Sequence, residues 1–418
     1  MKGRAWRSRG LALMLAAALL GSACGGNDGS SGGSSGGQLS GDLSVWGMQL
    51  EGENMKKLAE DFMKENPDVN VQVDIISWDV AHDKLLTAVA GNETPDVSLM
   101  GTTWMGEFAE NGSLAEAPDS IDDGAFFDSA WNTAVSQGTS YGIPLYIDTR
   151  VLYYRTDIAK KAGFDGPPET WSELKQMAVA MQAKGGAKYG IYMMPNNWQE
   201  LLPFIWQAGG DVMTDDYQSY TFDSPEVVEA LAFQKWFFDK GLIPETPPEG
   251  YDPTQPFVDG DVPMFFSGPW HVALIEDTGG KKLQGKWAVA PMPENESNTS
   301  FAGGGDLVVF NQAENQEAAW AFAEYLARPE VQANFYDLTG DLPAVEAAWE
   351  RSSLEGDATR QVFRRQFVDT KVPPVIPKWE EVATGAIFPS MEKVMIGGAT
   401  PEQGAQEMQA KAESIGVE

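Results

Sequence analysis

Three polar side chains interrupt an apolar run near the middle of the chain. Residues 142–155 read GIPLYIDTRVLYYR, in which Asp148, Thr149 and Arg150 separate two segments apolar enough to form short strands. The run stands where one series of alternating strand and helix patterns ends and a second series begins. We therefore interpret it as a crossing between two lobes, and we expect its polar centre to line the cleft between them.

Large aromatic residues stand where predicted strands or loops give way to helices. A strand that ends at residue 100 is followed by a short loop with Thr103 and then by a helix that carries Trp104. Because ligands collect at the carboxyl ends of strands in open α/β sheets, both are candidate contacts, although packing of Trp104 onto the sheet explains it equally well. Asn197 and Trp198 lie in a second loop, and Trp270 begins the helix that follows FFSGP. These residues are the first candidates for a binding cleft.

The elements that would position these residues follow a strand-helix alternation. Leu43, Val45 and Trp46 predict a short strand, and residues 69–75 alternate as a second one. A helical stripe of apolar residues follows each strand, and His82 lies on the second stripe, which favours a structural role for it. The alternation predicts an α/β fold whose parallel-type sheets are covered by helices. With 418 residues, the chain is too long for one ordinary core and suits two domains.

Charge and composition narrow the function classes. The chain has 61 acidic against 29 basic residues, a net charge of -32 that disfavours nucleic acids and anionic membrane surfaces as partners. With two His and one Cys, most nucleophilic and metal-based hydrolysis lacks its residues, so we predict neither an enzyme nor a metal or other cofactor. A secreted glycoside hydrolase with two catalytic carboxylates stays open as an alternative, because acid pairs are inevitable in so acidic a chain.

The N-terminus predicts export. Basic residues precede an apolar segment, 11–20, that is too short to span a bilayer but suits a signal peptide, which we place at 1–23. Gly-Ser-Ala before the lone Cys24 resembles the lipobox of bacterial lipoproteins, although the usual Leu three places before the cysteine is absent; an ordinary secretory cleavage site is the alternative. The Gly/Ser tract up to residue 38 predicts a flexible tether. We therefore expect a protein that is lipid-anchored at the extracellular face of the cell membrane.

Several longer motifs carry a family resemblance in their order and spacing. They are TPDV followed by FAENGSL, YGIPLYIDTRVLYYR, PPETWSEL, FVDGDVPMFFSGPW, GGGDLVVF and AWAFAEYLARPEVQ. Together they span nearly the whole mature chain. The chain resembles the extracellular solute-binding proteins that serve ABC transporters for oligosaccharides, the group that contains maltose-binding protein.

This resemblance implies the two-lobed periplasmic-binding-protein fold of type II, with several hinge crossings and a ligand cleft between the lobes. It places residues 39–145 and 301–338 in an N-terminal lobe and residues 146–300 and 339–418 in a C-terminal lobe. It also implies a monomer whose partners are an oligosaccharide and the permease subunits of an ABC transporter. The membrane would be contacted through the lipid anchor alone.

The resemblance also implies ligand residues. Asp148 matches an acidic position that accepts sugar hydroxyls, and Trp270 matches a stacking Trp. Trp198 and Trp379 fall near two further aromatic positions, and Gly304 and Asp306 lie in the glycine-rich run where the family has a polar residue. Gln49 stands where the maltose-binding type has an Asp-Lys pair, so a maltose-like binding mode is not implied. The full predicted set is Trp46, Gln49, Trp78, Thr103, Trp104, Asp148, Arg150, Asn197, Trp198, Trp270, Gly304, Asp306 and Trp379.

The chemistry of a sugar agrees with this set. A sugar ring has an apolar face, which flat aromatic residues cover, and a rim of hydroxyls, which carboxylates and amides bind. The sequence therefore predicts a binding protein for a neutral oligosaccharide, of two to four rings, that leaves its ligand unchanged. A binding protein for a charged solute, such as a glycerol phosphodiester or a polyamine, is the second alternative, with Arg150 as the cation that an anion would need.

Overall fold

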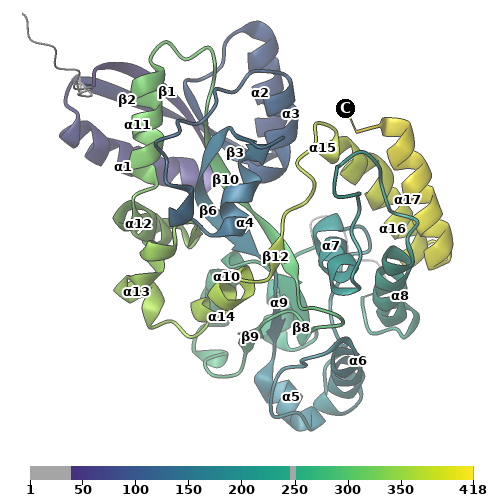
Figure 1. Cartoon of the computed structure of the whole chain (residues 1–418). Helices are drawn as coiled ribbons and strands as arrows, with labels where there is room; N and C mark the ends of the chain where they lie inside the picture. Colours follow the sequence, from purple (N-terminus) through teal and green to yellow (C-terminus); the bar gives the residue numbers. More distant parts are fainter. Residues whose placement is uncertain (1–38, 245–250, 418) are drawn as a thin grey trace, which may run out of the picture. The chain divides into compact units, whose positions relative to one another are not determined.

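The larger of the two main sheets has seven strands and combines segments that are far apart in the sequence (Figure 1). The computed structural model describes residues 39–244 and 251–417. The strand order is β11-β6-β10-β3-β1-β2, with β12 paired to β10. The bounds are β1 Gly41–Met48, β2 Val69–Ile76, β3 Val97–Gly101, β6 Gly142–Thr149, β10 Ser300–Val309, β11 Leu342–Pro343 and β12 Thr370–Lys371.

Strand direction in this sheet is mixed. β1 runs parallel to β2 and β3, as the alternation predicts, whereas β10 runs antiparallel to both β3 and β6. On β2 the structure buries Val69, Val71 and Val73, but Ile75 is 40% exposed and Ile76 is buried in its place. The expected alternation is therefore wrong at the last two residues of this edge strand, Ile75 and Ile76.

Helices lie on both sides of the seven-stranded sheet. Figure 1 shows α1, α11 and α12 on one side and α2 and α3 on the other. Their bounds are α1 Gln49–Glu65, α2 Trp78–Gly91, α3 Met105–Glu110, α11 Gln316–Leu326 and α12 Pro329–Thr339. The buried face of α1 carries Met55, Leu58, Ala59 and Phe62, which recur at the three- and four-residue spacing of a helical stripe.

The second main sheet begins directly after the polar interruption. β6 ends at Thr149, Arg150 follows, and β7 Val151–Tyr154 forms the centre of a three-stranded antiparallel sheet with β8 Met264–Ser267 and β9 Ala288–Ala290. Residues 142–155 thus connect the two sheets, as the sequence predicts. A short hairpin, β4 Val135–Ser136 with β5 Thr139–Ser140, precedes β6.

The remaining described helices follow in chain order. They are α4 Asp128–Thr133, α5 Thr156–Ala162, α6 Trp171–Ala180, α7 Trp198–Gln207, α8 Pro225–Asp239, α9 Thr254–Asp259, α10 Trp270–Gly279, α13 Ser352–Glu355, α14 Arg360–Phe367, α15 Trp379–Val382, α16 Phe388–Met395 and α17 Pro401–Ile415. Short 3-10 segments cover Thr102–Trp104, Asp123–Ala125, Gly280–Lys282 and Glu346–Glu350, and π turns cover Met181–Gly185 and Ala383–Ile387.

Two hydrophobic cores form within the described residues. One gathers around the seven-stranded sheet and extends to Tyr153 and Phe265 of the second sheet, and the other gathers around α6, α7, α8, α16 and α17. The cores therefore do not divide at the predicted lobe boundaries. β10, which starts at Ser300, pairs with β3 and β6 of the large sheet. The boundaries near residues 145, 300 and 338 stay a prediction.

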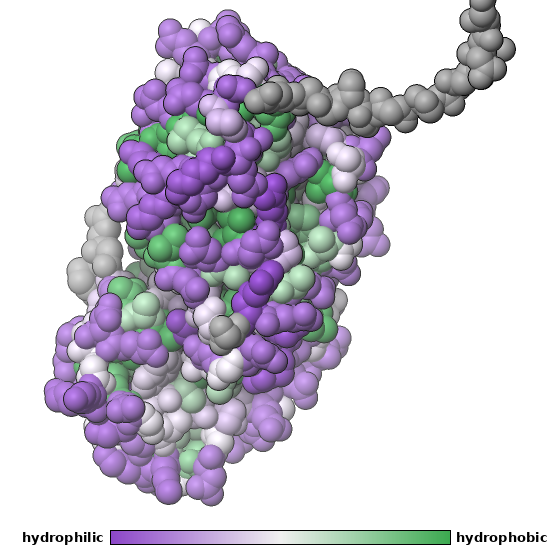
Figure 2. Space-filling view, turned by 90° about the vertical axis from the view of Figure 1, so that its left-hand side faces the viewer, coloured by the Kyte–Doolittle hydropathy of each residue, from purple (hydrophilic) through white to green (hydrophobic). Residues whose placement is uncertain are grey.

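One face of the surface is predominantly hydrophilic (Figure 2). Hydrophilic residues predominate on the face in Figure 2, with hydrophobic ones scattered among them, as is normal for soluble surfaces. Within residues 39–244 and 251–417, no helix combines the length and apolar character that crossing a bilayer requires. The predicted signal peptide, Cys24 and the tether up to residue 38 lie outside the described residues.

Candidate functional site

A pocket of about 210 Å³ gathers five of the predicted ligand residues. They are Trp78, Thr103, Trp104, Asp148 and Gly304, and they share the pocket with Gly101, Thr102, Tyr146, Gln199, Phe301 and Gly303. The lining comes from the carboxyl end of β3, the start of α2, the end of β6, the start of α7 and the first half of β10. Small-molecule sites usually measure about 300–1,000 Å³, so this pocket accounts for part of an oligosaccharide.

The polar interruption supplies the charged centre of the site. One guanidinium nitrogen of Arg150, Nη1, donates to Asp148, and the other, Nη2, donates to Oε1 of Gln199 over 2.9 Å. The side chains of Arg150 and Asp148 are only 9% and 17% exposed. Two aromatic rings flank this cluster, because the guanidinium lies 4.8 Å from the Trp270 ring centre and 5.0 Å from that of Phe301. Arg150 thus fixes the carboxylate and two aromatic rings in one arrangement.

Trp270 opens α10 and is 39% exposed, so its ring is available beside the Asp148–Arg150 pair. The ring lies against Gly268, where an added Cβ would meet it at 2.0 Å. A side chain at position 268 would therefore displace the indole. The glycine before Pro269 thus leaves the space that this ring occupies, although Trp270 stands beside the pocket lining and not within it.

An aromatic series extends from the pocket into the core. Phe301 lines the pocket, Trp198 packs edge-on against it at 5.7 Å, and Trp379 packs edge-on against Trp198 at 5.3 Å. Trp198 is 5% exposed and Trp379 is completely buried. The structure therefore corrects the prediction for both residues, because their hydrophobic rings support Phe301 from behind and have no face left for a ligand.

Glycines shape the pocket side of β10. Gly304 has a φ of +140°, and an added Cβ would meet the carbonyl oxygen of Tyr146 at 2.2 Å. At Gly303 it would meet the Phe301 ring at 2.4 Å. Only glycine lets β10 approach β6 this closely, and the register shifts directly afterwards, between Gly305 and Asp306. The predicted Gly304 thus contributes backbone to the site.

Asp306 lies in the core, not in the pocket, which corrects the sequence expectation. It is completely buried, and the hydroxyl of Thr133 lies 3.1 Å and 3.2 Å from its two oxygens. That hydroxyl has a single hydrogen and also lies 2.7 Å from the carbonyl oxygen of Ala130. A protonated Asp306 satisfies both contacts by donating to Thr133, in agreement with a pKa that burial raises to about 8.

This buried carboxyl predicts a pH dependence of stability. The unfolded carboxyl releases its proton near pH 3.8, whereas folded Asp306 keeps it up to about pH 8. Its contribution to the unfolding free energy is therefore complete below about pH 4 and is lost as the pH rises through 8. Between pH 5 and 9, the unfolding free energy of the wild type should fall by about 4 kcal/mol more than that of Asp306→Asn, as measured by urea titrations. Asp79→Asn, at an exposed position of α2, is the control, and equal losses in all three proteins would contradict the assignment.

Asn197 caps helix α7 and contacts the buried acid Glu200. Its side chain caps α7 by accepting from the backbone N–H of Gln199, and it contacts Glu200 at 3.5 Å. Glu200 is buried, which raises its pKa to about 8, while the backbone N–H of Met194 donates to it. The structure thus uses the predicted Asn197 to orient the start of α7, and this places Gln199 in the pocket.

Trp46 and Gln49 stand apart from the pocket lining. Trp46 is half-buried on β1 under the Lys84 ammonium, 4.3 Å from its ring centre, and Gln49 contacts Ser77 at 3.4 Å. In contrast, Trp78 and Trp104 meet edge-on at 5.6 Å on the pocket wall. His82, predicted to be structural, packs behind Trp104 at 5.2 Å.

Sequence reasoning missed four side chains that line the pocket, the first of which, Thr102, directly precedes the predicted Thr103. Tyr146 lies two residues before Asp148 on the same strand, so the two-residue period of a strand places both on one face. Gln199 directly follows Trp198, one residue beyond the predicted pair. Phe301 lies two residues before the glycine-rich run, which begins at Gly303. Each stands within three residues of a predicted position, so a wider search around those motifs could have found them.

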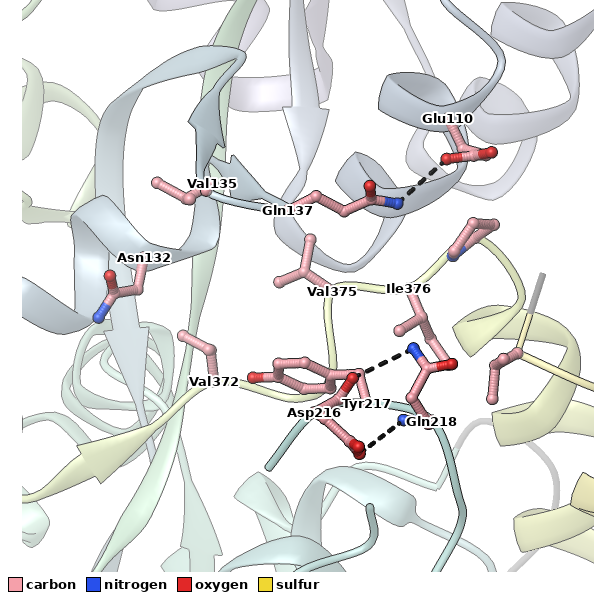
Figure 3. A pocket seen from close by; sticks show the side chains of 13 residues that line it. Glu110, Asn132, Val135, Gln137, Asp216, Tyr217, Gln218, Val372, Val375 and Ile376 are labelled. Carbon is pink, nitrogen blue, oxygen red and sulfur yellow. Dashed lines mark hydrogen bonds between the residues drawn. The ribbon is translucent and has the colours of Figure 1, made fainter. Parts of the chain in front are cut away.

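A larger pocket, of about 660 Å³, contains none of the predicted residues (Figure 3). Its walls come from the β4–β5 hairpin region, the loop at 216–218 and the segment at 372–377. Its polar groups pair largely with one another, because Gln137 donates to Glu110 and Gln218 donates to Asp216 (Figure 3). Tyr217 supplies its one aromatic ring and is 49% exposed. This pocket offers fewer aromatic faces than the one at Asp148.

Known proteins resemble this chain along most of its length. The maltodextrin-binding protein MdxE of Bacillus subtilis is 26% identical over 346 residues, which cover 80% of each chain. The solved sugar-binding protein MalE of Xanthomonas citri is 32% identical, with a TM-score of 0.84 over 90% of this chain and 97% of that one. The GacH receptor of Streptomyces glaucescens, solved unliganded and with acarbose, is 26% identical, with a TM-score of 0.80 over 90% and 98%.

These matches confirm the two-lobed α/β fold of the MalE type. The relatives are solute-binding proteins and not enzymes. The model of the bacterial extracellular solute-binding protein family matches residues 25–333, which is more than half of the chain. The chain therefore belongs to the bacterial extracellular solute-binding protein family.

Proposed function

We propose that this protein captures an oligosaccharide in the pocket at Asp148 and delivers it to the permease of an ABC importer. The observation that carries the proposal is the arrangement around Arg150, where a carboxylate, an amide and two aromatic rings converge. Planar acceptors and aromatic faces are the two kinds of group that a sugar ring needs. The names of similar proteins support the same ligand class, since they include maltodextrin, diacetylchitobiose and acarbose binders.

The ligand residues that we propose are those that the pocket and Arg150 bring together. Trp78, Trp104 and Trp270 supply ring faces. Asp148, Gln199 and Thr103 supply polar groups, Gly304 supplies backbone, and Arg150 holds the set in place. We propose two to four rings, because the exposed Trp270 lies outside a pocket that is itself too small for a whole oligosaccharide.

A thermal-shift screen tests the proposal. Maltotriose, diacetylchitobiose and mannotriose should include at least one sugar that raises the melting temperature, because a ligand at 100 times its Kd stabilises a protein by about 2.7 kcal/mol. Glycerol phosphodiesters and polyamines are the comparison set for the charged-solute alternative. If only those shift the melting curve, the oligosaccharide assignment is wrong.

A second experiment tests whether the protein leaves its ligand unchanged. Long incubation with the best sugar, followed by chromatography, should return the sugar intact, and catalytic cleavage would identify a hydrolase.

We also propose that Cys24 carries a lipid that anchors the protein outside the cell membrane. The proposal rests on the small residues before Cys24 and the Gly/Ser tract after it. Cys24→Ala should move most of the protein from the membrane fraction to the medium or the soluble fraction, because one signal for stable attachment is lost. Gly26→Ala, two residues into the tether, is the matched control. Membrane attachment that survives in Cys24→Ala would contradict the anchor.

A further inference from the structure

Two carboxyl groups that do not line the pocket, those of Asp341 and Glu51, interact with the lining residues Asp148 and Trp78. In the antiparallel pairing of β11 with β6, Leu342 lies opposite Ile147 and Pro343 opposite Tyr146. Continued by one residue, this register sets Asp341 opposite Asp148, and directly opposed side chains in such a pair have Cβ atoms about 4.5–5.5 Å apart. The two carboxyl groups are therefore close neighbours, and like charges in this arrangement repel.

Glu51 joins them from α1. The side chain of Trp78, which lines the pocket, donates a hydrogen bond to the Glu51 carboxyl group. Burial first, and then the nearby charge of Glu51, raise the pKa of Asp341 to about 7, and Asp148 adds to the effect. The pKa of Tyr146, between them, lies well above its usual value, through burial and then through Asp341, Glu51 and Asp148. We call Glu51, Asp148 and Asp341 the carboxylate wall.

Two oxygen atoms of this wall are buried and have no partner. They are Oε2 of Glu51 and Oδ2 of Asp341. Within the described residues, no group of three or more acidic, His or Cys side chains is placed to hold a metal ion, so a metal does not explain them. The cation beside the wall, Arg150, already donates one nitrogen to Asp148 and the other to Gln199. Glu51 and Asp341 thus keep acceptor capacity that the protein itself does not use, and Asp341 adds a negative charge above about pH 7.

We propose that the carboxylate wall makes this pocket select saccharides by charge, admitting uncharged rings and rejecting anionic ones such as uronic acids and sugar phosphates. This inference rests on the proposed function. A hydroxyl donates to a carboxylate through a strong, charge-assisted hydrogen bond. An anionic substituent at the same place meets like charges in a partly buried site, where salt screens them little. It also finds no free fork on Arg150, which an anion would require.

Calorimetric titration with matched neutral and anionic sugars tests whether the carboxylate wall selects by charge. The probes are maltotriose and diacetylchitobiose, each compared with a counterpart in which one C6 carbon is oxidised to a carboxylate, at pH 8, above the pKa of Asp341. We expect the wild type to bind a neutral probe at least about 10-fold more tightly than its anionic counterpart, which corresponds to about 1.4 kcal/mol. The variant Glu51→Gln/Asp341→Asn keeps the shapes and removes two charges, so this ratio should fall toward one. The control Glu53→Gln, at an exposed position of the same helix, should keep the wild-type ratio.

The outcomes separate the inference from the proposed function. An anionic probe that binds the wild type as tightly as its neutral parent overturns the charge selection and leaves the oligosaccharide function standing. A ratio that the double variant does not change overturns the assignment to Glu51 and Asp341. If neither neutral probe binds, the proposed function fails together with the inference. Circular dichroism and melting curves check folding, and Asp341→Asn alone serves if the double variant does not fold, with a smaller change of the ratio in the same direction.

Discussion

Trp270→Ala should weaken oligosaccharide binding about 30- to 1,000-fold, equivalent to roughly 2–4 kcal/mol, the range of an aromatic hot spot. The ring is 39% exposed. The Arg150 guanidinium lies 4.8 Å from its centre, and the ring packs against Gly268. A ring held in place before the ligand arrives loses little conformational entropy on binding. Calorimetric titration with the best sugar from the thermal-shift screen measures the effect.

Two variants sharpen this experiment. Tyr217→Ala removes a ring that is 49% exposed in the larger pocket, and it should leave the Kd unchanged. Gly268→Ala keeps the indole but places a methyl group where the ring now lies, so it should weaken binding in the same direction as Trp270→Ala. Because Trp270 is partly exposed, its truncation should cost less stability than the about 3–5 kcal/mol of a core Trp. A Trp270→Ala protein that melts far below the wild type yet binds normally would show that the ring belongs to the core.

The sequence predicted best where a local pattern also determines position in space. The polar interruption at 148–150 falls at the junction of two strands, with Asp148 and Thr149 ending β6 and Arg150 preceding β7, because two apolar segments of strand length must pair separately. Trp270 begins a helix because Pro269 precedes it and suits the start of a helix. Thr103 and Trp104 follow the carboxyl end of β3, as the general rule for α/β sheets requires.

The sequence predicted least well where burial depends on distant segments. Trp198 and Trp379 carry equally large rings, but contacts between α7, β10 and α15 decide that they fill the core. Asp306 follows a glycine run, and nothing in the neighbouring sequence indicates that it is buried. In the structure, the register of β10 shifts after Gly305, and Asp306 lies buried beside Thr133. Likewise, Asp341 comes near Asp148 only because β11 pairs with β6, and this contact between residues 193 positions apart (341 minus 148) has no local signal. Such contacts are properties of the tertiary fold.

Asp148→Ala should reduce both stability and affinity. Arg150 is buried, and without Asp148 its Nη1 group loses its charged partner. Removal of one member of a buried ion pair typically costs about 3–5 kcal/mol, because an uncompensated charge stays behind. Loss of a charged acceptor for a sugar hydroxyl costs about 1.5–3 kcal/mol more in binding, or about 10- to 150-fold in Kd. Urea unfolding and calorimetric titration measure the two losses separately.

Asp148→Asn distinguishes charge from shape. Its amide oxygen can still accept from Arg150 and from a hydroxyl, so we expect both losses to lie between those of the wild type and Asp148→Ala. Because Arg150 contacts both Asp148 and Trp270, the effects of Asp148→Ala and Trp270→Ala on binding should not add. Once Asp148 is gone, the guanidinium no longer holds the indole in place, and removing the ring should then cost less than it does in the wild type. Additive losses in the double variant would show that the carboxylate and the ring act independently, and the arrangement around Arg150 would then not be the organising feature of the site.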